Sequence, residues 1–235
     1  MSKAKKNKKL SPSDQKPWFE LKGISALTDT QEEVFSEYDN GQNLVLHGYA
    51  GTGKTYISLY LALETLLKNE TKYDKIIIIR SVVPSRDMGF LPGSVTEKAR
   101  VYEEPYREIF NNLFGRGDGY EILKQKKLLE FTTTSFLRGI TWNNAIVIVD
   151  EIQNMQFSEI DTVMTRLGDN SKIIFCGDFR QTDFKRDDEK SGLKKFLKIL
   201  DRMDNFSHIE FKQEDIVRSG IVRDYIIKKA RMEEE

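Results

Sequence analysis

The chain has 235 residues, of which 39% are hydrophobic and 31% charged, as is typical of a globular protein with one substantial domain. Its 37 Lys and Arg residues balance 37 Asp and Glu residues, so binding to nucleic acid requires a local basic patch rather than net charge. The apolar runs are too short to span a membrane, no apolar segment follows the basic N-terminus, and Cys176 is the only cysteine. These features predict a cytoplasmic protein without a membrane partner or a disulfide.

The N-terminal segment, residues 1–17, carries five lysines between positions 3 and 9 and then Ser, Pro and Asp. This composition predicts a disordered basic tail, followed by one folded domain over residues 18–235. The tail is either a solubilising extension or a salt-sensitive contact with nucleic acid, since lysines bind phosphates without sequence preference.

The first structured segment combines a helix with a strand–turn–helix pattern. Thr30-Gln31-Glu32-Glu33 is a capping-box sequence that predicts a helix continuing to Tyr38. After the turn at Asp39-Asn40-Gly41, the apolar run from Leu44 to Leu46 predicts a buried strand. A glycine-rich stretch and a helical pattern from Tyr56 to Lys68 follow, which is the context of a phosphate-binding loop.

The glycine-rich stretch is Gly48-Tyr49-Ala50-Gly51-Thr52-Gly53-Lys54-Thr55, which has the glycines, lysine and threonine of a P-loop. Its backbone N–H groups can converge on phosphate oxygens, and the next helix adds the positive end of its dipole. We predict that these eight residues bind the phosphates of a nucleoside triphosphate. Lys54 would reach the β- and γ-phosphates, and the Thr55 hydroxyl would bind Mg²⁺. The alternative is a glycine-rich turn that carries the pattern by chance.

The remaining elements alternate between strands and helices. Strands are predicted over Lys75–Arg80, Leu128–Thr133, Ala145–Val149, Lys172–Cys176 and Ser207–Phe211. Helices are predicted over Glu103–Phe114, Ser158–Leu167, 191–202 and 221–232. Because alternating strands and helices pair in parallel and place helices on both faces, we predict a three-layer α/β fold with a mainly parallel sheet.

Two strand ends carry further candidate site residues. Asp150 and Glu151 follow a buried strand, whose carboxyl end faces the ligand crevice of such a sheet. Asp150 is predicted to complete the Mg²⁺ shell and Glu151 to orient and deprotonate the attacking water; a surface turn with two acids is the alternative. After the next strand, the loop presents Asp178 and Gln181. The uncharged amide of Gln181 suits a contact with the γ-phosphate or water, unless this is an ordinary polar strand end.

Gly48–Thr55, Asp150–Asn154 and Gly177–Gln181 together resemble the ATPase core of superfamily 1 helicases, and the chain resembles the PhoH family more closely. The same family pattern is found in Arg80–Pro84, Gly89–Gly93, Glu97-Lys98, Arg138-Gly139 and Asp215–Ser219. The resemblance covers about residues 24–230 and implies a RecA-like P-loop ATPase core, often in ring-shaped oligomers, with an RNA-linked role. Some relatives carry a fused nuclease or RNA-binding domain, for which we expect no room here.

The resemblance also implies roles for Gln31 and an arginine. Gln31 resembles the glutamine with which superfamily 1 helicases read adenine, or it is a solvated residue of a first helical turn. Those enzymes take arginines from a second RecA-like domain. We expect only one such domain here, so a neighbouring subunit could supply the arginine. This predicts a homo-oligomeric ring, such as a hexamer, with ATP at its subunit interfaces. Arg218 is the first candidate for the arginine that reaches the ATP of a neighbouring subunit, ahead of Arg80 and Arg138. The alternative for Arg218 is a salt bridge with Asp215.

Aromatic and basic residues alternate over residues 82–144, as would suit RNA or another single-stranded nucleic acid. A stripe with helical spacing is assigned to the core: Tyr102, Tyr106, Phe110 and Phe114 or Leu113. The better candidates for nucleic-acid contact are the loop residues Arg86, Phe90 and Lys98.

These patterns predict a Mg²⁺-dependent ATPase coupled to RNA or single-stranded nucleic acid, with a helicase-like core. The alternative is a nucleotide-dependent switch or assembly factor that acts on a protein partner. A small-molecule kinase is disfavoured, because the acid pair and Gln181 suit attack by water. His47 and His208 have no cysteine cluster beside them, so we expect no transition-metal site.

Overall fold

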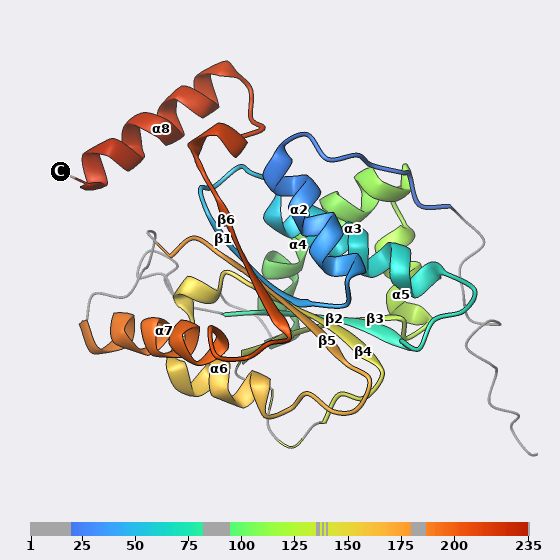
Figure 1. Ribbon diagram of the computed structural model, residues 1–235. Helices are drawn as coiled ribbons and strands as arrows, with labels where there is room; N and C mark the ends of the chain where they lie inside the picture. The colour runs from blue at the N-terminus through green and yellow to red at the C-terminus, as the bar shows by residue number, and fades with distance from the viewer. Residues whose placement is uncertain are drawn as a thin grey trace, which may run out of the picture.

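The computed structural model describes residues 20–81, 95–134, 137, 139, 141–179 and 187–234. In this part of the chain, six strands form one sheet: β1 (Asn43–Gly48), β2 (Lys75–Arg80), β3 (Leu129–Thr133), β4 (Ala145–Asp150), β5 (Lys172–Gly177) and β6 (Phe206–Phe211). The strand order is β3-β2-β4-β5-β1-β6, and each neighbouring pair is parallel (Figure 1). The predicted parallel α/β fold is confirmed.

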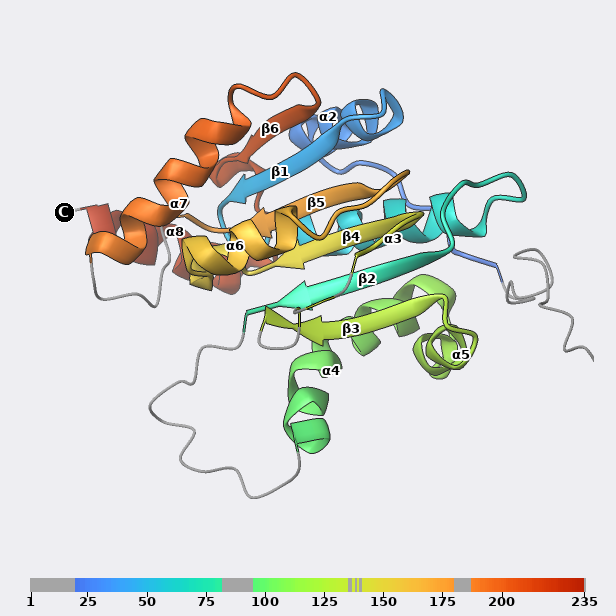
Figure 2. The same ribbon diagram turned by 90° about the horizontal axis from the view of Figure 1, so that it is seen from below.

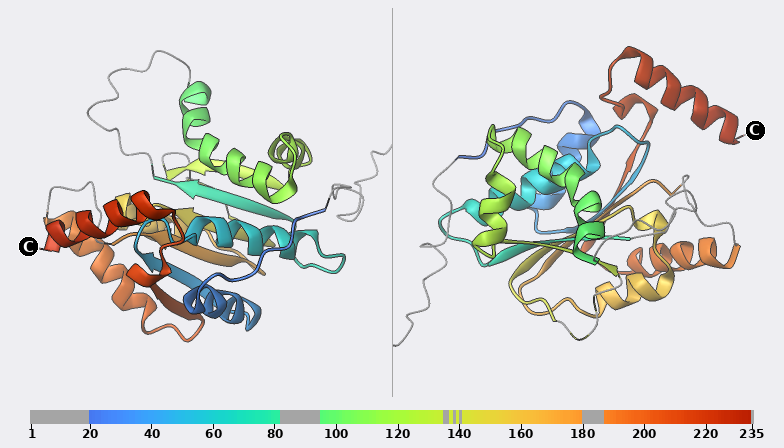
Figure 3. Two further views of the ribbon diagram at one scale, coloured as in Figure 1. Left: turned by 90° about the horizontal axis from the view of Figure 1, so that it is seen from above. Right: turned by 180° about the vertical axis from the view of Figure 1, so that it is seen from behind.

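Helices cover both faces of the sheet and complete the three layers (Figure 2). One face carries α2 (Asp29–Asp39), α3 (Lys54–Leu67), α4 (Val95–Phe114) and α5 (Gly119–Gln125). The other face carries α6 (Phe157–Met164) and α7 (Asp187–Leu200). Short 3₁₀ helices η2 (Ile152–Asn154) and η3 (Gln213–Asp215) follow β4 and β6. The last helix, α8 (Gly220–Glu234), lies beyond the carboxyl ends of the strands (Figure 3).

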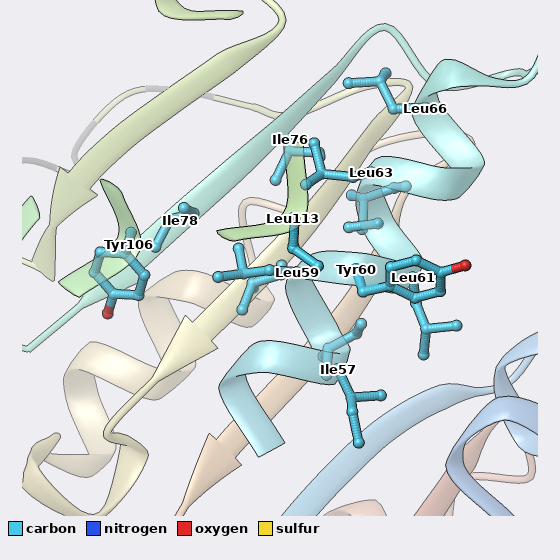
Figure 4. Close-up of a cluster of buried hydrophobic side chains, with 14 of the residues drawn as sticks. Ile57, Leu59, Tyr60, Leu61, Leu63, Leu66, Ile76, Ile78, Tyr106 and Leu113 are labelled. Atoms are coloured by element: carbon cyan, nitrogen blue, oxygen red, sulfur yellow. The ribbon is translucent and has the colours of Figure 1, made fainter. Parts of the chain in front are cut away.

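Burial on both faces explains why the central strands β2, β4 and β5 are largely continuous apolar runs. In β2, Ile76 and Ile78 pack with α3 and α4, whereas Ile77 and Ile79 pack on the opposite face with the α6 and α7 cluster. Figure 4 shows the first of these clusters, in which leucines of α3 lie against Ile76 and Ile78. Successive side chains of a strand point to opposite faces, so a strand covered on both sides needs apolar residues at every position.

The strand order determines which segments meet at the functional edge. β5 lies between β1, which leads into the P-loop, and β4, which ends at Asp150. This is the arrangement of a RecA-like core. Because all strands run in one direction, the segments that follow β1, β2, β4 and β5 emerge along the same edge of the sheet.

Two local predictions were wrong. Helix α2 begins at Asp29 and is capped by Thr28, whose hydroxyl accepts a hydrogen bond from the Gln31 backbone N–H, so Thr30 is not the cap. Helix α4 begins at Val95 and continues through Pro105, because its buried apolar side chains compensate for the hydrogen bond that proline cannot donate.

The predicted tail lies outside the described residues. Within them, no helix combines the length and apolar character that crossing a membrane would require.

Candidate nucleotide-binding site

A pocket of about 480 Å³ lies at the carboxyl ends of the strands, within the usual size range of small-molecule sites. Several separate segments line it: the P-loop, the end of β2, the middle of α4, the residues after β4 and β5, and the segment before α8. Ala50–Thr55, Arg80, Tyr106, Asp150, Glu151 and Arg218 are among the lining residues. The fold therefore brings together most of the site residues predicted from distant positions in the chain.

The P-loop requires glycine where it leaves β1. Gly48 has a φ of 113°, and a Cβ atom there would overlap the carbonyl oxygen of Phe211 on β6. That same carbonyl accepts a hydrogen bond of 3.0 Å from the Tyr49 N–H. The first glycine of the motif thus allows the loop to turn directly against the neighbouring strand.

The ammonium group of Lys54 is held by the loop itself. It donates hydrogen bonds to the carbonyl oxygens of Gly48 (2.9 Å) and Tyr49 (2.7 Å) and to the Thr52 hydroxyl (3.3 Å). Burial lowers the pKa of Lys54, and the nearby carboxylate of Asp178 opposes this shift.

Asp150 is buried, and two hydroxyl groups hold its carboxylate. Thr55 Oγ1 donates to Oδ1 at 2.9 Å, and Tyr106 Oη donates to Oδ2 at 2.9 Å. Burial and the charge of Glu151 raise the pKa of Asp150, and the hydrogen bonds from Tyr106 and Thr55 oppose the rise. Burial, reinforced by the Asp150 charge, raises the pKa of Tyr106 well above 10, so this phenol keeps its proton and acts as the donor.

The oxygen atoms of Thr55 and Asp150 fit a Mg²⁺ ion. Mg²⁺ prefers hard oxygen ligands and is commonly bound by one or two protein groups together with substrate phosphates and water. Thr55 and Asp150 are the candidate pair because they supply such oxygens to the pocket. No group of three or more His, Cys, Asp or Glu residues suited to a metal occurs among the described residues.

Glu151 follows β4 in a left-handed backbone conformation, with φ 56° and ψ 42°, and lines the pocket. Such conformations are uncommon for residues other than glycine and cluster at functional sites. The buried Gln153 amide donates a hydrogen bond to the Glu151 carboxylate, and its oxygen accepts one of 3.1 Å from the Asp178 N–H. Gln153 therefore joins the ends of β4 and β5. In the sequence, the only signal of this role is the position of Gln153 two residues after Glu151.

Gln31 is 3% exposed, so its interpretation as a solvated residue is wrong. Its side-chain nitrogen donates to the Thr52 carbonyl at 2.9 Å, and its oxygen accepts from the Leu27 N–H at 2.8 Å. Both ends of the amide are engaged by the backbone, one of them by the P-loop. The adenine-reading role remains a prediction.

Arg218 lies in the pocket of its own chain. The Val217 N–H donates a 3.1 Å hydrogen bond to the Gly51 carbonyl, and the Arg218 side chain packs so closely on Gly51 that a Cβ there would approach its Cγ to 2.8 Å. The Asp215 carboxylate accepts instead from the Lys212 N–H at 2.7 Å. Arg80 also lines the pocket.

Gln181, Arg138, Arg86, Phe90 and the side chain of Lys98 lie outside the described residues.

The profile of a known family, described as PhoH-like protein, matches residues 23–229. The chain belongs to the PhoH-like protein family. A PhoH-like protein of Bacillus subtilis (strain 168) is 35% identical over 202 residues, which cover 86% of this chain and 62% of that protein. Protein PhoH of Escherichia coli (strain K12) is 32% identical over 200 residues, covering 84% and 56%. This PhoH-like chain thus spans somewhat more than half the length of these relatives.

Solved helicase structures are also similar to this PhoH-like chain. The Hef helicase domain of Pyrococcus furiosus matches with a TM-score of 0.47 and 12% identity, over 79% of this chain and 39% of that one. Unliganded Pif1 from Bacteroides sp. matches with a TM-score of 0.40 and 15% identity, over 88% and 45%. Family membership, together with the RecA-like core and the P-loop, makes this chain a PhoH-like P-loop NTPase, a fold that implies nucleotide binding.

Proposed function

We propose that this PhoH-like protein hydrolyses ATP in a Mg²⁺-dependent reaction. The observation that supports this most directly is the meeting of the P-loop, Asp150 and Glu151 in one pocket. A P-loop alone binds phosphate, whereas a metal-binding carboxylate and a second carboxylate beside it provide for attack by water.

Each residue has a separate task in this proposal. Lys54 exchanges its carbonyl partners for the β- and γ-phosphates, and Thr55 and Asp150 hold the metal, which neutralises charge on the phosphates when bound. Glu151 orients the attacking water and accepts its proton. The positive charge of Arg218 lies at the P-loop, where it would stabilise the transition state, and Gln181 would contact the γ-phosphate.

The Glu151→Gln variant tests the hydrolytic step. The amide cannot accept the proton, so we expect turnover to fall by about 100-fold or more while ATP affinity stays within about twofold. Phosphate release and equilibrium binding of a fluorescent ATP analogue measure the two quantities. Glu64→Gln, in α3 and outside the pocket lining, is the control and should behave as wild type. Normal turnover in Glu151→Gln would remove Glu151 from this role.

We further propose that hydrolysis is coupled to RNA or single-stranded nucleic acid and that the protein acts as a homo-oligomeric ring. Support comes from the family resemblance and from α8, which lies beside the P-loop and exposes several large apolar side chains. They are Ile221, Val222, Tyr225 and Met232. An exposed apolar stripe of this kind is typical of a surface that is covered in an assembly.

Turnover with and without single-stranded RNA or DNA at low salt, together with the mass in solution, tests this coupling. Stimulation that weakens as salt rises would support a nucleic-acid partner. Unchanged turnover would instead favour the second candidate function, a nucleotide-dependent switch whose partner is a protein. A monomeric mass at micromolar concentration would contradict the ring.

A further inference from the structure

Tyr106 brings a hydroxyl group from α4 to the candidate metal site. Its side chain is 1% exposed and belongs to the core cluster in Figure 4, yet it also lines the nucleotide pocket. The hydroxyl donates its 2.9 Å hydrogen bond to Oδ2 of Asp150. The aromatic stripe correctly predicts that Tyr106 packs in the core, but it does not predict the contact of its hydroxyl group with Asp150.

The ring of Tyr106 is held in place by two neighbouring strands. Its centre lies 5.6 Å from that of Phe131 on β3 and 6.0 Å from the guanidinium carbon of Arg80 on β2. Arg80 in turn lies next to Asp150, with which it pairs in the register of β2 and β4. Because these contacts fix the ring, they also fix the position of its hydroxyl group relative to the carboxylate.

The two oxygens of Asp150 have different partners. Oδ1 faces the hydroxyl of Thr55, the other candidate metal ligand, and Oδ2 faces Tyr106. A carboxylate held at only one oxygen can rotate about its last bond, whereas two donors from different elements define its plane. Outer partners of this kind orient metal ligands, and their removal commonly weakens metal binding 10–100-fold.

We propose that Tyr106 is a positioning residue for the metal site. Its hydroxyl group holds the Asp150 carboxylate so that the oxygen beside Thr55 is presented to Mg²⁺. This inference rests on the proposed Mg²⁺-dependent nucleotide binding. It assigns to α4 a direct connection with the metal-binding carboxylate, in addition to its packing on the sheet.

The Tyr106→Phe variant keeps the ring and removes the hydroxyl group. Binding of a fluorescent ATP analogue would be measured first in EDTA and then across a Mg²⁺ titration. We expect the Mg²⁺ concentration that gives half of the affinity enhancement to rise about 10-fold or more, with affinity in EDTA unchanged. Tyr120→Phe is the matched control, since Tyr120 is also 1% exposed and bonded to a carboxylate, that of Glu103, but does not line the pocket.

The outcomes separate this inference from the proposed function. If wild-type protein binds the analogue equally well with and without Mg²⁺, the proposed metal dependence fails. If Mg²⁺ strengthens binding to wild type and Tyr106→Phe responds like Tyr120→Phe, or loses affinity equally in EDTA, the inference about Tyr106 is overturned.

A second variant covers the case in which Tyr106→Phe does not fold. Loss of the donor would leave a buried carboxylate oxygen unpaired, so the neutral amide of a Tyr106→Phe/Asp150→Asn double variant should restore folding. Restored folding, measured by thermal unfolding, would support the coupling of the two residues. A double variant that also fails to fold would contradict it.

Discussion

Among the individual residues of the pocket, Gln31 shows most clearly how a polar side chain supports the P-loop. Its amide connects the Thr52 carbonyl to the Leu27 N–H, and the bond to Thr52 is buried. A buried backbone group that loses its partner costs about 1–3 kcal/mol, so this single side chain can determine whether the loop keeps its shape. An amide engaged in this way stabilises the loop whether or not it also contacts a base.

The Gln31→Ala variant distinguishes loop support from adenine recognition. Because the loop loses a buried hydrogen bond, we expect affinity for ATP and for GTP to fall together, by about 10-fold. If Gln31 reads adenine, the preference for ATP over GTP would decrease instead. Competition binding of the two nucleotides measures this ratio. Glu33→Ala, on the exposed face of the same helix, serves as the control.

Among the secondary-structure elements, β6 has a direct influence on the P-loop. It pairs with β1 along its whole length, from Asn43 with Phe206 to Gly48 with Phe211. The loop therefore begins against the backbone of an edge strand that comes from the far end of the sequence. The segment after β6 contacts the loop again, through the Val217 N–H and the Gly51 carbonyl.

The Gly48→Ala variant tests this close approach. A methyl group at this position would overlap the Phe211 carbonyl, and the backbone would be strained at φ 113°. We expect a loss of about 2–4 kcal/mol in the free energy of unfolding, measured by urea titration. Gly220→Ala is the control, since a Cβ there has nothing within 4 Å, and we expect a change within about 0.5 kcal/mol. Equal stability of the two variants would contradict the assigned contact.

At the scale of the whole molecule, the pocket of one chain already contains arginines. Arg80 and Arg218 line it together with Lys54. Arginines of the same chain are therefore candidates for the role that the sequence-based prediction assigns to a neighbouring subunit. What an assembly would cover is the exposed side of α8, on the outside of the molecule beyond the strand ends (Figure 3).

A mixing experiment shows whether Arg218 acts within its own chain. Lys54→Ala and Arg218→Ala should each turn over ATP slowly, and we expect their mixture to regain no activity, because each pocket would still lack one residue. Turnover is followed while exchange of labelled subunits is monitored. Recovery to a substantial fraction of wild-type turnover would show instead that subunits share the site. Arg223→Ala, on α8 and outside the pocket lining, is the control.

The elements with strong local signals were predicted correctly in kind. Four consecutive isoleucines predict a strand that is buried on both faces, and β2 is such a strand. The start of α2 was predicted two residues too late, although the bond from the Gln31 N–H to the Thr28 hydroxyl that caps it is local. The extent of α4 was not predicted, because it depends on contacts from outside the segment. Pro105 would end an isolated helix, whereas here α4 is stabilised by the sheet on which it packs.

By itself, the sequence determined the parallel α/β fold, the P-loop and the carboxylates at the end of β4, since each is encoded in a short segment with its own chemical pattern. The tertiary structure decided which distant side chains meet them. It placed Tyr106 on Asp150, Gln31 on Thr52 and Arg218 on Gly51. Local periodicity records only that a side chain is buried, and the order of the strands and the packing of the helices determine what it touches there.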